Sequence, residues 1–117
     1  MFILEVIIYR RKAATQWEVV YTFIEGTINH IHALVPDKEN DCLWILTGDF
    51  EDAAGIWKAT NNFVSVEKVL MGNQLYRGCV AFPMRKGILY ATDSQLEQNS
   101  IRLWDFYRRY LFFCNLC

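Results

Sequence analysis

Prolines and long apolar runs are scarce in this sequence, and its charges nearly cancel. The chain has only 2 prolines and 6 glycines in 117 residues, and signals that start or stop helices are few. No run approaches the ~20 uninterrupted apolar residues of a membrane-spanning helix. The 12 Lys and Arg residues against 13 Asp and Glu residues give a formal net charge of -1. This balance excludes a general attraction to nucleic acid or to an anionic membrane through net charge.

The N-terminal segment also lacks the features of a secretion signal. Residues 2–8 are apolar, but Glu5 interrupts them, no basic residue precedes them and no small-residue cleavage site follows them. We therefore expect a β-strand here. With neither a signal peptide nor a membrane segment, the sequence favours a cytoplasmic location.

The four cysteines show no zinc-binding pattern. Cys42 and Cys79 lie in apolar, strand-like runs, where a reduced thiol behaves as a small hydrophobic group. Cys114 and Cys117 form a single Cys-Asn-Leu-Cys pair, whereas a structural zinc site usually takes two such pairs. We expect this pair to lie in a frayed tail, and the sequence predicts neither a metal nor a cofactor.

Short β-branched and aromatic runs alternate with polar turn segments along most of the chain. Hydrophobic residues make up 53% and aromatic residues 15% of the sequence, which is too apolar for disorder. The runs recur about every 8–12 residues, a spacing typical of a sandwich, a barrel or a propeller. Strands are predicted at residues 3–10, 17–23, 29–35, 42–47, 55–60, 64–70, 77–83, 87–92 and 100–104.

A repeat of 45 residues favours the propeller among these folds. Thr47 and Thr92 stand at equivalent places in two of the runs, and 92 − 47 = 45. The same offset relates two further pairs, Ile56 with Ile101 and His32 with Arg77. A period of about 40–50 residues that holds four short strands is that of a propeller blade.

We therefore predict an all-β fragment of a β-propeller, with about two blades of four-stranded antiparallel sheet. Residues 29–70 form one complete blade, residues 1–23 supply the outer strands of the preceding blade, and residues 77–104 supply the inner strands of the next. Residues 105–117 are expected to be a C-terminal tail, a non-native terminus, because no turn residue separates them from Trp104. The alternative is that they form the missing outer strand. Since propellers close with about 4–8 blades, the chain is expected to be part of a ring.

Four short motifs carry a resemblance to a known family. They are His30-Ile31-His32, Thr47-Gly48-Asp49, Gln74-Leu75-Tyr76-Arg77 and Thr92-Asp93-Ser94. In the order and spacing of these motifs, the chain resembles the Asp-box (BNR-repeat) superfamily of sialidase-like β-propellers, in particular its glycosyl-hydrolase-like members. Residues 59–66 match the Asp-box hairpin in degenerate form. The resemblance implies a propeller fold and a relation to glycan-active proteins.

Blade geometry predicts where the polar residues of these motifs meet. The start of the innermost strand and the end of the next lie on the same rim, because the two strands are antiparallel. This geometry gathers His30, His32, Asp49, Arg77 and Asp93 on one face near the axis. Arg77 offers donors suited to a carboxylate, and His30 and His32 are ligand-binding candidates. Asp49 and Asp93 are the catalytic candidates, as acid and base, or acceptors for sugar hydroxyls.

Each of these residues has a structural alternative. Asp49 and Asp93 stand at strand ends, where aspartate often caps its own turn. Arg77 could pair with a carboxylate of a neighbouring blade instead of a ligand. The two histidines fall short of the three or four ligands that a metal needs. A further group is expected in the core between blades rather than as a platform for sugars: Trp44, Trp57 and Tyr90.

The sequence thus predicts a partial sialidase-like propeller, related to glycosyl hydrolases, with no turnover on its own. The resemblance implies a site with an arginine cluster, a tyrosine nucleophile and an acidic residue, and only Arg77 and Asp93 match parts of it. Two alternatives stay open: a non-catalytic module whose unpaired strand edges recruit a second copy or another chain, and a truncated, inactive gene product. A carbohydrate or an anionic small molecule is the expected ligand, and neither nucleic acid nor a membrane is an expected partner.

Overall fold

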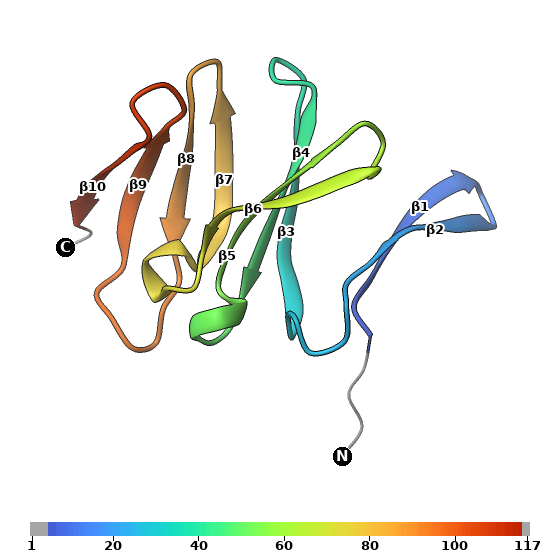
Figure 1. Ribbon diagram of the computed structural model, residues 1–117, viewed down its shortest axis with the longest axis horizontal. Coiled ribbons are helices and arrows are strands. Elements are labelled where there is room, and N and C mark those ends of the chain that lie inside the picture. The colour runs from blue at the N-terminus through green and yellow to red at the C-terminus, as the bar shows by residue number, and fades with distance from the viewer. Residues whose placement is uncertain (1–4, 116–117) are drawn as a thin grey trace.

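The computed structural model describes residues 5–115, and over this range the protein is all-β (Figure 1). Its strands form one two-stranded hairpin and two four-stranded antiparallel sheets. The hairpin pairs β1 (Ile7–Ala13) with β2 (Gln16–Thr22). In this part of the chain, no helix is long and apolar enough to cross a membrane.

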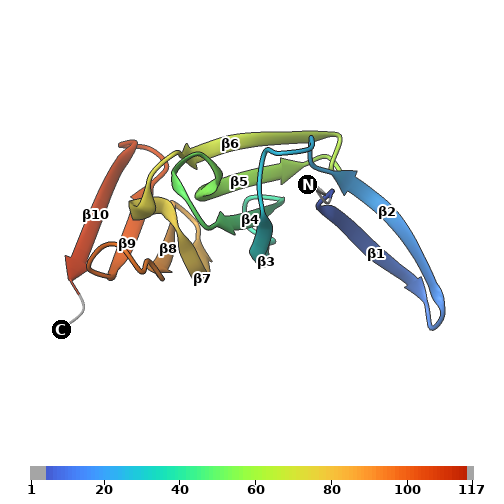
Figure 2. The ribbon, with the colours of Figure 1, turned by 90° about the horizontal axis from the view of Figure 1, so that it is seen from below.

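The two larger sheets are built in the same way, strand by strand outward from an inner strand. The first consists of β3 (His30–Asp37), β4 (Cys42–Gly48), β5 (Gly55–Thr60) and β6 (Ser65–Met71), with the short 3-10 helix η1 (Glu51–Ala53) before β5. The second follows the 3-10 helix η2 (Gln74–Tyr76) and consists of β7 (Gly78–Met84), β8 (Gly87–Thr92), β9 (Ser100–Asp105) and β10 (Tyr110–Asn115). The inner strands β3 and β7 contact each other, and the sheets spread away from them (Figure 2).

The 45-residue repeat has a counterpart in these sheets. The first residues of β8, β9 and β10 follow those of β4, β5 and β6 by 45 positions each, since 87 − 42, 100 − 55 and 110 − 65 all equal 45. Equivalent contacts lie at the repeated threonines. The Thr47 hydroxyl oxygen lies 3.4 Å from the Gly55 carbonyl oxygen, and the Thr92 hydroxyl oxygen lies 3.3 Å from the Ser100 carbonyl oxygen. The offset therefore relates two sheets of like construction.

Residues 105–115 correct one expectation from the sequence. The expectation of a C-terminal tail after Trp104 is wrong for these residues, and the alternative of an outer strand is confirmed, because Asp105 forms a turn. Its carboxylate accepts hydrogen bonds from the backbone N–H groups two and three positions on, each at 2.9 Å, and Arg109 has a φ of 52°. The chain reverses there, and β10 pairs antiparallel with β9 as an outer strand. Cys114 lies exposed in β10, and Cys117 lies outside the described residues.

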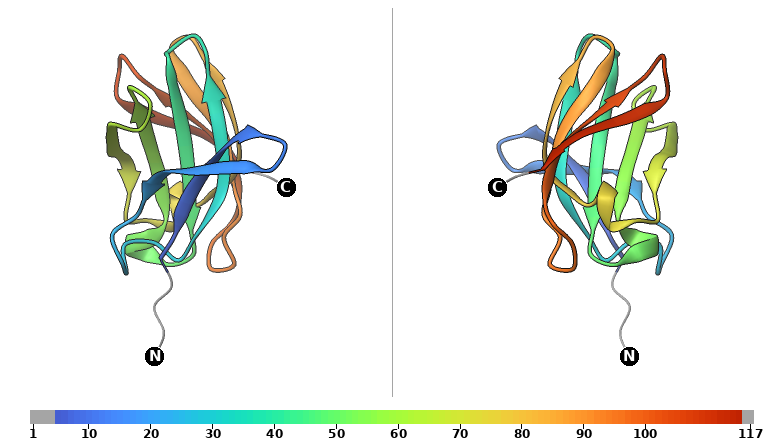
Figure 3. Two further views of the ribbon diagram at one scale, coloured as in Figure 1. Left: turned by 90° about the vertical axis from the view of Figure 1, so that its right-hand side faces the viewer. Right: turned by 90° about the vertical axis from the view of Figure 1, so that its left-hand side faces the viewer.

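Apolar side chains fill both faces of the β3–β6 sheet. One cluster joins this sheet to the β7–β10 sheet and includes Trp44 and Tyr90, which are 2% and 1% exposed. The other joins it to the β1–β2 hairpin and includes Trp57, which is 4% exposed. The hairpin runs at a steep angle to the strands of the larger sheets (Figure 3). These three aromatic side chains are core residues, as the sequence predicts, and their burial excludes a role as a platform for sugars.

Two further sequence features have structural counterparts. Burial raises the pKa of the Cys42 thiol to about 11, as expected for a cysteine that acts as a small hydrophobic group. Residues 59–66 contain the turn between β5 and β6, the third and fourth strands of their sheet. Asn61, Asn62 and Phe63 all adopt a positive φ in this turn, at 50°, 55° and 67°. The likeness of this hairpin to an Asp-box stays a prediction.

A buried carboxylate, Asp37 at the end of β3, accepts hydrogen bonds from the Trp44 indole at 2.9 Å and from the Asn40 amide at 2.8 Å. Burial by itself raises the pKa of Asp37, but these hydrogen bonds outweigh it and hold the pKa below the ordinary value of 3.8. A carboxyl group of this kind stabilises the fold above its unfolded pKa, and the stabilisation is lost as the pH falls through its folded pKa.

Asp37→Ala is expected to lower the free energy of unfolding at pH 7 by about 1–3 kcal/mol, because it leaves the buried indole N–H without its acceptor. The deficit should shrink as the pH falls below about 4, because the unfolded chain then binds a proton at Asp37 more readily than the folded protein does, and the wild type loses this stabilisation. Urea unfolding at pH 7 and pH 3 measures it, with Glu39→Ala, an exposed carboxylate in the same hairpin, as the matched control. Equal deficits at pH 7 and pH 3 would show that the Asp37 charge contributes no stability.

Candidate functional site

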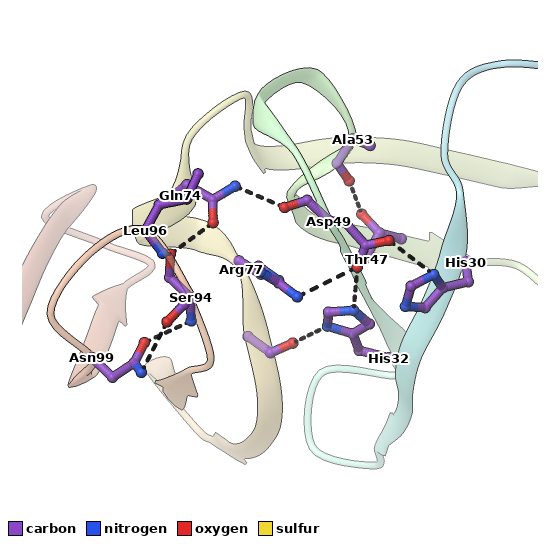
Figure 4. Close-up of polar contacts among 11 residues, drawn as sticks. His30, His32, Thr47, Asp49, Ala53, Gln74, Arg77, Ser94, Leu96 and Asn99 are labelled. Carbon is purple, nitrogen blue, oxygen red and sulfur yellow. Dashed lines mark hydrogen bonds and ion pairs between the residues drawn. The ribbon is translucent and has the colours of Figure 1, made fainter.

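Four polar side chains meet at the rim where the two larger sheets adjoin (Figure 4). Asp49 follows the end of β4, His30 and His32 lie on β3, and Arg77 immediately precedes β7. The Asp49 carboxylate lies 3.1 Å from His30 Nδ1 through Oδ2, and 3.4 Å from both His32 Nε2 and Arg77 Nη2 through Oδ1. We refer to these four residues as the Asp49 cluster. The structure thus brings together four of the five residues that the sequence predicts on this rim.

The backbone of β3 and β4 explains how His32 reaches Asp49. The register of the two strands shifts between Ile31 and Ala33, which places an irregularity of the β-bulge kind at His32. Bulges re-aim a side chain relative to its neighbours. The two imidazole rings nevertheless lie together, with centroids 4.8 Å apart, as expected from their spacing of two residues.

Gly48 leaves the room that the His32 ring occupies. A Cβ atom at Gly48 would lie 2.3 Å from His32 Cε1 and 2.5 Å from His32 Nε2. Atoms at these distances overlap, so any side chain at position 48 displaces the ring. The glycine of the Thr47-Gly48-Asp49 motif is therefore required for the close approach of His32 to Asp49. The peptide bond between Gly48 and Asp49 is cis.

Gln74 forms hydrogen bonds with the segments that follow β4 and β8, one from each of the two larger sheets. Its side chain is 2% exposed, and its amide donates to the Asp49 carbonyl at 2.8 Å. Its oxygen accepts a hydrogen bond from the Ser94 hydroxyl, also at 2.8 Å. Both residues lie within the four short motifs, but their residue types alone indicate no role in a site. The repeat offset was the signal for Ser94, since 49 + 45 = 94 places it at the position of Asp49.

Asp93 is not part of the cluster, which corrects the expectation that all five residues meet. Its side chain is exposed, and its backbone N–H donates to the Arg77 carbonyl at 3.0 Å. Within residues 5–115, no ion pair joins its carboxylate to His30, His32 or Arg77. The physical reason is the repeat: 93 − 45 = 48, so Asp93 occupies the place of Gly48 and not that of Asp49.

The alternative interpretation of Asp49 as a turn cap is also wrong, whereas Ser94 does cap its turn. Among the residues that the structure describes, the carboxylate of Asp49 contacts His30, His32 and Arg77, and no hydrogen bond joins it to the backbone of its own turn. In the second sheet, the Ser94 hydroxyl accepts from the backbone N–H groups of Leu96 and Glu97, at 3.0 and 3.2 Å. Equivalent positions thus serve different purposes in the two sheets.

Arg77 pairs with a carboxylate of the adjoining sheet, as one interpretation of the sequence predicts. The residue is only 9% exposed. Among the described residues, its side-chain hydrogen bond runs from Nη2 to Asp49 Oδ1 at 3.4 Å, and the buried Nε has no partner. A guanidinium carries five N–H donors, so this arginine retains capacity for a further acceptor.

Tyr90 is a fully buried tyrosine on β8, and its environment does not activate it as a nucleophile. Its hydroxyl donates to the Leu75 carbonyl at 2.9 Å. Burial raises the pKa of Tyr90 above its ordinary value, which keeps the phenol protonated. A nucleophile requires the opposite shift or an adjacent base.

Fold and cluster together define an all-β protein of four-stranded antiparallel sheets with a polar cluster between two inner strands. No family model matches the chain, and neither a curated protein nor a solved structure matches it significantly.

Proposed function

We propose that this chain is a segment of a sialidase-like β-propeller and that it acts as a non-catalytic binding module for an anionic sugar or a related small acid. The observation that carries the proposal is the convergence of His30, His32 and Arg77 on Asp49, between the inner strands of two sheets. The repeat of 45 residues supports the propeller. The order of the four motifs supports the relation to glycan-active proteins.

The cluster offers both charge and access to such a ligand. The unused donors of Arg77 suit a carboxylate. The His32 side chain is largely buried, at 11% exposed, whereas the His30 side chain is 55% exposed and faces solvent. A ligand that enters past His30 can place its carboxylate at Arg77 and its hydroxyl groups at Asp49.

The same geometry supports binding without turnover. Glycosidases of the usual kinds flank the scissile bond with two carboxyl groups, and the Asp49 cluster contains one. The Asp49 carboxylate is occupied by three cationic or protonatable groups, and Tyr90 is held protonated in the core. Hydrolysis of an aryl sialoside by the purified chain would contradict this part of the proposal.

Further sheets would complete the proposed ring. The β1–β2 hairpin has only two strands within the described residues, and a two-stranded sheet is marginally stable alone. It also exposes large apolar side chains, with Tyr9 at 54%, Trp17 at 61% and Val19 at 56%. Unpaired edges of this kind accept strands from a second copy or from another chain.

Titration with N-acetylneuraminic acid in a buffer with EDTA tests the binding function, with the methyl ester of the sugar as the neutral control. We expect shifts of backbone NMR signals around residues 30–32, 48–49 and 77–78 with the acid and not with the ester.

Arg77→Met should weaken binding at least about tenfold, the loss expected for a charge-assisted hydrogen bond. Arg85→Met, an exposed arginine on the turn after β7, should leave it unchanged. Equal binding of acid and ester, or full affinity in Arg77→Met, would refute the proposal.

A further inference from the structure

In its neutral form, the His32 ring cannot donate a hydrogen bond to both of the oxygens that it faces. Nδ1 lies 3.1 Å from the Gly78 carbonyl oxygen, and Nε2 lies 3.4 Å from Asp49 Oδ1. Both of these oxygens only accept hydrogen bonds, and a neutral imidazole carries a single N–H. When Nδ1 donates to Gly78, the lone pair of Nε2 points at a carboxylate. A cation placed between Nε2 and the carboxylate removes this conflict.

The ligand atoms around that position are spaced as a metal ion requires. One ligand atom each from His30, His32 and Asp49 can be chosen so that all three lie within 4.8 Å of one another. The short nitrogen-to-oxygen distances are 3.1 Å from His30 Nδ1 to Asp49 Oδ2 and 3.4 Å from His32 Nε2 to Asp49 Oδ1, so the two histidines face different oxygens of the same carboxylate. In a tetrahedral zinc site with bonds of about 2.0–2.1 Å, ligand atoms lie about 3.3–3.4 Å apart. Only small side-chain movements are needed to close the triad on an ion.

The surroundings of the triad orient it in the way that metal sites do. A metal-ligating histidine usually donates its other N–H to a carbonyl or a carboxylate, which fixes the tautomer and the ring. His32 has this arrangement through Gly78, and Gly48 lets its ring lie close against the backbone. The main chain at Asp49 is in turn held by the buried Gln74. The ligand atoms are thus positioned by β3, by the segment after β4 and by the first residue of β7.

We propose that His30, His32 and Asp49 bind a divalent transition-metal ion, with zinc as the ion that fits the donor set. Two imidazoles and one carboxylate suit zinc and its neighbours in the first transition series. The sequence-based expectation of no metal counted only the two histidines, and Asp49 supplies the third ligand of the proposed site. A carboxylate has about four lone-pair sites, so Asp49 can bind the ion and keep its contact with Arg77. The site leaves a coordination position open on the side of the exposed His30.

This inference concerns the same side chains as the proposed function but does not depend on it. The metal is tested without sugar, and the sugar is tested in EDTA, so either result stands if the other fails.

Calorimetric titration of the metal-free, 117-residue chain with zinc chloride tests the inference. We expect one ion per chain. Asp49→Asn and His32→Ala should each weaken binding at least tenfold, whereas Asp93→Asn, an exposed aspartate outside the cluster, should not. A variant with Cys114→Ser and Cys117→Ser should bind as the wild type does, which separates this site from thiolate binding.

Imidazole nitrogen NMR signals supply a readout that a purely structural role would not change. The chain has only 2 histidines, so zinc should shift Nδ1 of His30 and Nε2 of His32 and leave the Nδ1 of His32 protonated. Absence of binding at 100 µM zinc, full affinity in Asp49→Asn, or loss of binding in the cysteine variant would overturn the inference.

Discussion

Replacement of Trp44 by alanine is expected to lower the free energy of unfolding by about 3–5 kcal/mol, the usual loss for a large aromatic side chain removed from a core. Trp44 is 2% exposed and lies in the cluster between the two larger sheets. Its ring stacks on Phe106, which follows β9, at a centroid distance of 5.5 Å and an interplanar angle of 20°. Its indole also donates to the buried Asp37 at 2.9 Å. The substitution therefore removes contacts within one sheet and between both.

Trp17→Ala is the matched control, because Trp17 is 61% exposed on the β1–β2 hairpin. Its expected loss is within about 0.5 kcal/mol, as for most surface substitutions. Urea unfolding followed by circular dichroism measures both variants. If both substitutions lower the free energy of unfolding by the same amount, Trp44 does not lie in a core shared by the two sheets.

Gly48→Ala is expected to abolish the arrangement of His32 and Asp49 while the sheets stay folded. The new methyl group would stand 2.3 Å from His32 Cε1 and 3.2 Å from Arg77 Nε. The His32 side chain is 11% exposed, so its ring has little free space and must turn away from Asp49. We expect at least a tenfold loss of zinc affinity, together with about 1–3 kcal/mol of stability lost to overpacking.

Gly26→Ala separates the two effects of that substitution. Gly26 has a φ of 81°, so alanine is strained there, but a Cβ atom would meet no atom within 4 Å. This variant should lose stability and keep the zinc affinity of the wild type. Calorimetry on both variants gives the comparison. A Gly48→Ala protein that binds zinc normally would contradict the close approach of His32.

The strands of this fold could be predicted largely from the sequence, because their pattern is local. Alternating apolar runs and the 45-residue offset locate nine of the ten strands. The tenth, β10, is only the alternative interpretation of residues 105–117, because the segment after Trp104 contains neither glycine nor proline and the role of Asp105 in a turn was not recognised. The offset itself indicated it, since 65 + 45 = 110. For β10, the 45-residue repeat therefore predicts the strand, whereas the search for local turn residues does not.

The candidate site was predictable only in part, because its details depend on register. The rim position of His30, His32, Asp49 and Arg77 follows from strand order alone. The bulge at His32 and the direction of the Asp49 carboxylate depend on how β3 and β4 pair, which no sequence pattern specified. Asp93 was placed in the cluster by its motif, although the offset assigns its position to a glycine. The metal triad became recognisable only once the orientation of Asp49 was known.

The central claim is that β3 and β7 lie side by side and bring His32 next to Gly78, 46 residues further along the chain. Nuclear Overhauser effects from the His32 ring protons test it most directly, because only 2 histidines need to be assigned. The expected result is cross-peaks from this ring to Gly48 and to Gly78, along with those between paired strands. Strand-to-strand cross-peaks within each sheet, but none from His32 to Gly78, would show that the sheets do not adjoin at this rim.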